Sequence, residues 1–163
     1  MQEELIFDEK VWTPPESFPD LSQEKLLAID VETKDPNLTT KGAGWFRDDG
    51  HLIGIAVASK DQQWYFPMRH EGRGNLSPNL VASWLRDQLL HGMDVVMHNA
   101  QYDLGWLHHE GITVHGSVFD TMVAAALLDE NRFSYSLDAL GSTYIGKRKA
   151  NLELNTTASQ HGV

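Results

Sequence analysis

Apolar residues in this chain gather in short runs bounded by polar or turn-forming residues, and several runs have the length and composition of β-strands. In the first run, 26–31, every residue except Asp30 is apolar, which is typical of a strand buried on both faces. Further strands are predicted at 51–59, 63–68, 95–97 and 112–114, the first two of these forming a hairpin around 60–62.

Other stretches have the period of amphipathic helices. One helix is predicted to start at Ser77–Pro78 and to end at Gly92. Further helices are predicted to run from Asn99 through Leu107 and to cover 121–128 and 136–144. Strands followed by strands that alternate with helices predict an α/β sandwich with a mixed sheet.

The chain is predicted to form one domain, residues 23–163, preceded by an arm, residues 1–22, that packs on it. Prolines fix the arm as an irregular segment, with a short strand at Glu4–Phe7. A short helix is expected after Asn151.

The chain has 163 residues, a formal net charge of −10 and no cysteine. Thiolate metal sites are therefore excluded, and carboxylate, imidazole or carbonyl ligands favour hard divalent cations. The negative charge would repel nucleic acid at long range unless bound cations reverse the field around a pocket. No apolar run is long enough to span a membrane and the first residues do not form a signal peptide, so we expect a cytoplasmic protein with no membrane partner.

Asp30 and Glu32 form the first candidate site. Alternate side chains of a strand share a face, so these two carboxylates project the same way, away from Leu27, Ile29 and Val31. Two carboxylates at the end of a buried strand repel each other, and a divalent cation beside them removes that cost. The alternative is that the strand ends here and both acids are solvated, since so short a motif is common.

Asp103, in the opening turns of the helix predicted after Asn99, is the second candidate. It lies four positions before Leu107 and therefore on the same helix face as a core leucine. A positively charged partner at this face would explain why an acidic side chain lies beside the packing residues. Stabilisation by the helix dipole is the alternative explanation. Asn99 can donate hydrogen bonds to a ligand or fix the turn.

The order of three segments resembles the DEDD exonuclease superfamily, and in particular the proofreading domain of phage family A DNA polymerases. The segments are 29–33 (Ile-Asp-Val-Glu-Thr), 98–103 (His-Asn-x-x-Tyr-Asp) and 119–122 (Phe-Asp-Thr-Met), with supporting matches at 35–38, 42–45, 65–70 and 129–137. The resemblance implies an RNase H-like exonuclease fold, a mixed sheet of about five strands flanked by helices.

The resemblance also implies a mechanism. In the superfamily four acidic residues hold two Mg²⁺ or Mn²⁺ ions, one of which activates the attacking water while the other stabilises the leaving 3′ oxygen. Carried over to this sequence, Asp30 would bridge both ions, Glu32 would help to hold the nucleophile-side ion, and Asp103 would reach the other ion, partly through water.

The fourth acid belongs to a final Tyr-x-x-x-Asp segment, and after Leu152 this sequence has neither a tyrosine nor an aspartate. Tyr135 and Asp138 are interpreted as structural residues. The domain is therefore expected to lack its last catalytic helix, to bind the nucleophile-side metal poorly and to have little activity by itself.

Contacts to the DNA strand are expected from Thr33, Asn99, Trp45 and Arg69. Trp45 and its neighbour Phe46 can stack on a base, and packing over the arm is the alternative. Arg69 belongs to a partly basic loop that contacts the strand backbone or is merely solvated.

Among the other polar residues, Asp120 is interpreted as a helix N-cap rather than a ligand. His108 and His109 are adjacent on a helix and do not share a face, so they are interpreted as surface residues.

Two functions are compatible with these features. The first is a proofreading 3′–5′ exonuclease that hydrolyses the terminal phosphodiester of a single-stranded DNA 3′ end, beside a polymerase domain or a separate polymerase chain, in the host cytoplasm if the chain is phage-encoded. The second is a catalytically incomplete module that binds single-stranded DNA or docks on a polymerase chain. An RNA-directed exonuclease of the same superfamily is a third reading, because the choice of DNA depends on the flanking matches.

Overall fold

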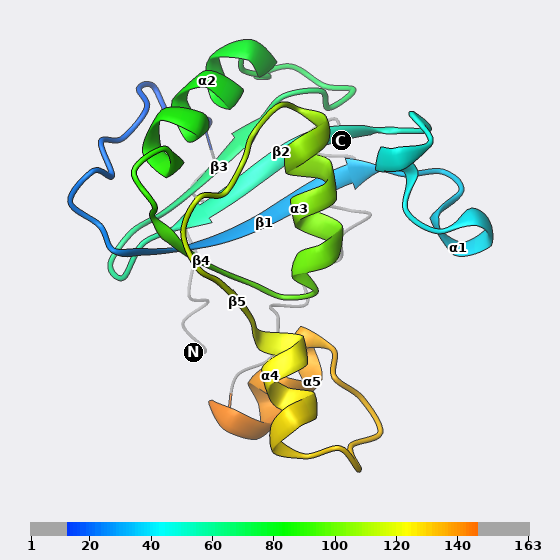
Figure 1. The fold of residues 1–163 in the computed structure, drawn as a ribbon. Helices are drawn as coiled ribbons and strands as arrows, with labels where there is room; N and C mark the ends of the chain where they lie inside the picture. Colours follow the sequence, from blue (N-terminus) through cyan, green and yellow to red (C-terminus); the bar gives the residue numbers. More distant parts are fainter. Residues whose placement is uncertain (1–12, 147–163) are drawn as a thin grey trace, which may run out of the picture.

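The structure is a computed structural model that describes residues 13–146 (Figure 1). Its elements, in chain order, are β1 (Leu26–Lys34), α1 (Leu38–Lys41), the 3-10 helix η1 (Gly44–Phe46), β2 (His51–Ala58), β3 (Gln63–Pro67), α2 (Pro78–Leu89), β4 (Asp94–Met97), α3 (Ala100–His109), β5 (Val118–Asp120), α4 (Thr121–Leu128) and α5 (Leu137–Tyr144).

The five strands form one sheet in the order β3-β2-β1-β4-β5. β1 pairs antiparallel with β2, and β2 with β3, whereas β1 and β4, and β4 and β5, pair in parallel. The predicted mixed sheet is therefore confirmed. The β2–β3 hairpin is also confirmed, and Ser59 N donates to Gln62 O across its turn (2.8 Å).

Helices α2 and α3 cover one face of the sheet, while α4 and α5 lie beyond β5, away from the other helices (Figure 1). The covered face holds the core, in which Leu27, Ile29 and Val31 of β1 are buried with residues of α2 and α3. On the other face Asp30 and Glu32 are exposed. The prediction that β1 is buried on both faces is therefore wrong for the described residues, because its alternate positions differ in burial although most of them are apolar.

The described part of the arm packs on β3 and α2. The ring of Phe18 stacks against those of Phe66 and Trp84, with centroids 5.7 and 5.5 Å away. Trp84 Nε1 donates to Pro19 O (2.8 Å), and Leu21 is buried. These contacts fix the residues that lead into β1.

One predicted strand is wrong. Residues 112–114 are not a strand, because the N–H of Ile112 donates to Leu107 O (2.9 Å) and closes the end of α3. The strand lies instead at β5, which leads directly into α4. The predictions for Glu4–Phe7 and for the segment after Asn151 fall outside the described residues. None of the helices between residues 13 and 146 is long and apolar enough to cross a membrane.

Candidate active site

β1 is longer than its neighbour β4, and this difference places Asp103. β4 pairs only with the first residues of β1, 26–28, so the Val31 N–H has no strand partner on that side. The chain leaves β4 at Met97 and enters α3, whose first turn brings Asp103 to this edge of β1. There Asp103 Oδ1 accepts a hydrogen bond from the Val31 N–H (3.2 Å). The Asp103 carboxylate therefore lies beside Val31, the residue between Asp30 and Glu32.

Asp103 is the buried acid of the site. Its side chain is 3% exposed, and no other charged residue within 13–146 is buried. Burial and the nearby negative charge of Asp30 raise the pKa of Asp103 to about 7, although the hydrogen bond from Val31 opposes the rise. A cation beside Asp103 would favour its charged form, so the carboxylate suits a metal ligand.

Asp30 and Glu32 stand on the exposed face of β1, opposite Ala56 and Gly54 of β2. Carboxylate oxygens are the donors that Mg²⁺ and Mn²⁺ prefer, so the donor chemistry fits these ions. Within residues 13–146, however, no three His, Asp or Glu side chains lie close enough together to hold a metal. Assembling such a site requires rotation of the exposed side chains or a ligand from beyond the described range.

Asp120 is confirmed as an N-cap, and it joins two helices. Its carboxylate accepts from Met122 N (2.8 Å) and Val123 N (3.3 Å) at the start of α4. It also accepts from Asn99 N (3.1 Å) and Ala100 N (2.8 Å) at the start of α3. Burial acts to raise the pKa of Asp120, but these hydrogen bonds outweigh it and lower the pKa.

Asn99 itself precedes α3 with a left-handed backbone (φ 67°), and its side chain makes no capping hydrogen bond. Asn99 is exposed, so the predicted contact to a ligand is sterically open. Asparagine tolerates this conformation better than most residues.

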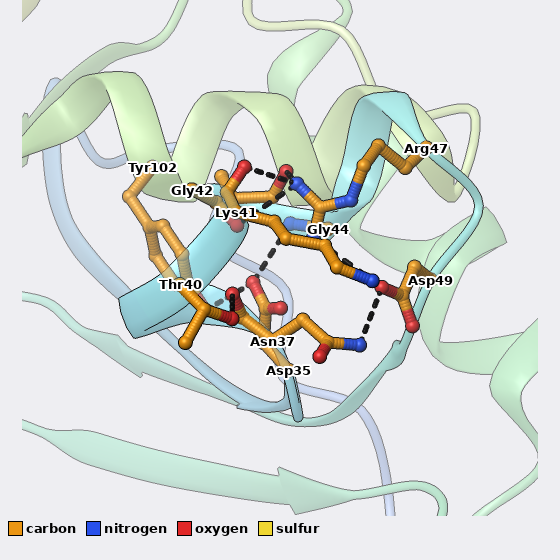
Figure 2. A network of polar contacts seen from close by, with 10 residues as sticks. Asp35, Asn37, Thr40, Lys41, Gly42, Gly44, Arg47, Asp49 and Tyr102 are labelled. Atoms are coloured by element: carbon orange, nitrogen blue, oxygen red, sulfur yellow. Dashed lines mark hydrogen bonds and ion pairs between the residues drawn. The ribbon is translucent and has the colours of Figure 1, made fainter.

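Thr33 is held in a polar chain that the sequence did not reveal. Its hydroxyl lies 2.6 Å from that of Tyr102, which also donates to Asp35 Oδ2 (3.3 Å). Asp35 Oδ2 in turn accepts from Gly44 N (2.8 Å). Figure 2 shows Asp35 between Tyr102 of α3 and the loop that holds Gly44. Tyr102 thereby ties the end of β1 to residues 35–50.

Arg47 and Asp49 order the rest of this loop (Figure 2). Asp49 Oδ2 accepts from Asn37 (2.8 Å) and pairs with Arg47 (3.4 Å). The Arg47 guanidinium also donates, at 2.7–3.0 Å, to the carbonyl oxygens of Lys41, Gly42 and Ala43. The loop beside the acids is therefore internally braced.

The two aromatic residues of the loop differ in exposure. Trp45 packs so tightly on α3 that a Cβ on Gly105 would lie 2.3 Å from its ring. Phe46 is 62% exposed, with the Arg47 guanidinium 5.1 Å from its ring centroid. Phe46 is therefore the better placed of the two to meet a base, while Trp45 fixes the loop to α3.

The donors of Arg69 are used inside the protein. Its guanidinium forms a two-point ion pair with Glu110 (2.8 and 2.9 Å) and donates to Leu52 O (2.8 Å). The predicted contact between Arg69 and a DNA strand stays a prediction, and the geometry gives it no support. Tyr135, interpreted as structural, donates to Asp129 O (2.9 Å).

Tyr65 is a neighbour of the acids that the sequence did not indicate. It follows Asp30 and Ala56 in one cross-strand row of the sheet, and its ring lies over Gly54. Its hydroxyl lies 2.5 Å from His70 Nε2. Burial, followed by the negative charges of Glu32 and Asp30, raises the pKa of Tyr65.

Tyr65 and Asp30 also line a groove of about 610 Å³ on the exposed face of the sheet. Most of the other lining residues are apolar, and His98 and Thr121, 2.9 Å apart, form its polar end. The groove therefore extends from Asp30 along the open sheet face to His98 and Thr121.

Known proteins of similar sequence identify the family. Residues 14–161 match the family DNA_pol_A_exo1, described as 3′–5′ exonuclease. The DNA-directed DNA polymerase of Pseudomonas phage M6 is 33% identical over 159 residues, which cover 93% of this chain and 24% of that protein. The chain spans about a fifth to a quarter of the phage polymerases that it matches.

Solved structures share the fold. Trypanosoma brucei RNase D superposes with a TM-score of 0.63 at 18% identity, over 87% of this chain and 47% of that chain. Brucella melitensis NrnC with bound Mg²⁺ superposes with a TM-score of 0.57 at 21% identity, over 82% and 61% of the two chains. These neighbours confirm the RNase H-like exonuclease fold. The chain belongs to the family of 3′–5′ exonuclease domains of family A DNA polymerases.

Proposed function

We propose that this chain is a metal-dependent 3′–5′ DNA exonuclease domain in which Asp30, Glu32 and Asp103 are the carboxylates that hold divalent ions. The observation that carries the proposal is the position of Asp103, a buried acid hydrogen-bonded to Val31 between the two exposed acids of β1. An acid kept at this position costs folding energy unless a charge partner is present.

The three residues would contribute differently. Asp103 is fixed by its hydrogen bond and by burial, so it would set the position of the site. Asp30 and Glu32 would approach a bound ion from the exposed face of β1. Divalent ions would supply an activated water and stabilise the charge that develops on the leaving oxygen. The Mg²⁺ in NrnC, a protein of the same fold, supports the choice of ion.

DNA as the substrate is supported by the relatives, which are DNA polymerases. The chain's net charge of −10 favours a strand end that reaches bound cations over a long duplex laid across the surface. Thr33, next to Glu32 on β1, Asn99 at the start of α3 and the exposed Phe46 are proposed as contacts to the last nucleotides. The partner is proposed to be a polymerase domain or chain.

A second candidate function is a catalytically incomplete module that binds single-stranded DNA or docks on a polymerase. The absence of a ready three-ligand group within residues 13–146 favours it. The two candidates differ in one measurable property, because only the exonuclease must bind divalent cations through Asp30 and Asp103.

The test combines cation binding with strand cleavage. Mn²⁺ binding is titrated by the EPR signal of free Mn²⁺, for the chain and for its Asp30→Asn, Asp103→Asn and Asp61→Asn variants, the last being an exposed acid of the hairpin turn. Cleavage of a 5′-labelled single-stranded oligonucleotide is followed for the chain and for a form extended by a Tyr-x-x-x-Asp helix. We expect Mn²⁺ binding that the first two substitutions weaken, and a ladder that shortens from the 3′ end in the extended form.

A 3′-phosphorylated oligonucleotide controls for the direction of cleavage, and an RNA of the same sequence tests the RNA-directed alternative. No Mn²⁺ binding by the chain, together with no cleavage by the extended form, would overturn the exonuclease proposal in favour of the second candidate function. Faster cleavage of the RNA than of the DNA would show that the assigned substrate is wrong.

A further inference from the structure

We propose that Tyr65, oriented by His70, is a positioning residue that donates its hydroxyl hydrogen to Glu32 and fixes the carboxylate for metal binding. The inference rests on the proposed function, since it assumes that Glu32 is a metal ligand. It adds a residue from β3 to a site otherwise built from β1 and α3.

The sheet register brings Tyr65 to the acids. Asp30, Ala56 and Tyr65 are successive partners across β1, β2 and β3, and directly opposed residues project from the same face. Ala56 between them is small, so the space beside Asp30 is open to a large side chain from β3. The Tyr65 side chain therefore shares the exposed face with both carboxylates.

Gly54 directs the phenol towards Glu32. Gly54 is the register partner of Glu32, and the Tyr65 ring lies directly over it. A Cβ at position 54 would overlap the Tyr65 hydroxyl and the ring carbon that bears it. The glycine thus leaves the space in which the hydroxyl reaches the strand position opposite Glu32. The raised pKa of Tyr65, caused by burial and by the charges of Glu32 and Asp30, agrees with this proximity.

His70 determines which way the Tyr65 hydrogen points. Asn75 holds the His70 backbone from both sides, accepting from its N–H (2.9 Å) and donating to its carbonyl (2.8 Å). His70 Nδ1 is buried without a hydrogen-bond partner, and burial lowers the pKa of His70, which favours a neutral ring. A buried N–H without an acceptor is costlier than an unused lone pair, so the proton belongs on Nε2. Nε2 then donates to the Tyr65 oxygen, and the Tyr65 hydrogen is left to point at an acceptor on the carboxylate side.

Such outer hydrogen bonds orient metal ligands, and removing them typically lowers metal affinity or activity about 10- to 100-fold. The test measures the Mn²⁺ dissociation constant by EPR, and kcat and KM on a single-stranded oligonucleotide in the extended form. For Tyr65→Phe we expect about 10-fold weaker Mn²⁺ binding and a lower kcat with an unchanged KM for DNA. Tyr135→Phe, which removes a phenol hydrogen bond to the backbone carbonyl of Asp129 in the loop between α4 and α5, should leave all three values unchanged.

Two further substitutions examine the chain of contacts. His70→Gln keeps a donor near Nε2 and should retain most of the Mn²⁺ affinity. His70→Leu should lower the Mn²⁺ affinity nearly as much as Tyr65→Phe does. The double variant, His70→Leu with Tyr65→Phe, should bind Mn²⁺ no more weakly than Tyr65→Phe alone. Gly54→Ala should displace the Tyr65 hydroxyl and reproduce the same loss while the tyrosine is still present. Circular dichroism checks that each variant is folded.

Wild-type Mn²⁺ affinity and kcat in a folded Tyr65→Phe variant would overturn the positioning role. An additive loss in the double variant would overturn the orientation by His70. If Asp30→Asn weakens Mn²⁺ binding but Tyr65→Phe does not, the exonuclease proposal stands and the Tyr65 inference alone fails. If Asp30→Asn has no effect on binding, both fail.

Discussion

Asp103 and Val31 are joined by a hydrogen bond between a carboxylate oxygen and a backbone N–H, across 72 positions of sequence. The bond satisfies a donor on the edge of β1 that β4 is too short to pair. It also buries a carboxylate beside two others, which a protein tolerates at a cost. The same contact therefore closes the edge of β1 and positions an acid of the proposed site, and the titration of the Asp103 carboxylate can be followed without substrate.

The stability of the metal-free protein should fall between about pH 4 and pH 7 because of Asp103. Its pKa is raised from the ordinary 3.8 to about 7, so over this range the folded protein holds a proton that the unfolded chain has lost. The stabilisation is complete below the unfolded pKa and is lost as the pH rises through the folded pKa, amounting to at most about 4 kcal/mol. Urea unfolding in EDTA at pH 5 and pH 8 measures it.

Asp103→Asn keeps an acceptor for the Val31 N–H but cannot ionise, so its free energy of unfolding should vary less over the same range. Asp61→Asn, at an exposed position, should follow the wild-type curve. Parallel pH profiles for the wild type and Asp103→Asn would show that Asp103 titrates normally.

Asp120→Ala should destabilise the fold. The Asp120 carboxylate accepts four backbone hydrogen bonds at the starts of α3 and α4. The loss of one N-cap costs roughly 0.5–2 kcal/mol, so the loss of two should cost about 1–4 kcal/mol. Asp61→Ala removes an equal charge without a cap and serves as the control in urea unfolding. An unchanged midpoint for Asp120→Ala would contradict the double cap.

Strand alternation was sufficient to place Asp30 and Glu32 on one face, because the period of two depends on local backbone geometry alone. The N-cap role of Asp120 was equally accessible, since capping is a local signal. The contact between Asp103 and Val31 was not, because it arises from the difference in length between β1 and β4, and periodicity does not reveal strand register.

Tyr65 was missed for a related reason. Its position beside the acids depends on two successive register relations, from β1 to β2 and from β2 to β3. The strand Gln63–Pro67 has large side chains on both faces, so its pattern does not show which face is covered. For residues 112–114 the error was to predict a strand that is absent. Their β-branched side chains indicated a strand, although the backbone of Ile112 is used to end α3.

Gly105→Ala should destabilise the protein, although replacing a helical glycine by alanine normally stabilises a helix by roughly 1 kcal/mol. The added Cβ would lie 2.3 Å from the Trp45 ring, and overpacking of this kind typically costs about 1–3 kcal/mol. Trp45→Leu in the same background should recover part of the loss, because the smaller side chain removes the overlap with the added Cβ. The substitution breaks no hydrogen bond of the indole N–H, which has no partner in the described structure. A Gly105→Ala variant more stable than the wild type in urea would show that Trp45 moves aside freely.

Phe46→Ala should weaken binding of single-stranded DNA while leaving the stability of the fold unchanged. The side chain is 62% exposed, so its removal costs little packing, whereas stacking of one base on an aromatic ring is worth roughly 1–3 kcal/mol. We expect affinity for a fluorescent oligothymidine to fall about tenfold in anisotropy titrations with Ca²⁺ in place of Mn²⁺. Trp45→Ala should instead lower the urea midpoint, because Trp45 fixes the loop to α3.

Phe133→Ala is the matched control for Phe46→Ala, since Phe133 is another exposed phenylalanine, in the loop between α4 and α5. Equal losses of DNA affinity in the two variants would indicate non-specific contact of exposed rings. Wild-type affinity in Phe46→Ala would remove base stacking from this loop. A loss confined to Phe46→Ala would place the strand end against the loop that Asp35 and Tyr102 join to α3 and to the end of β1, the two elements that carry the acids.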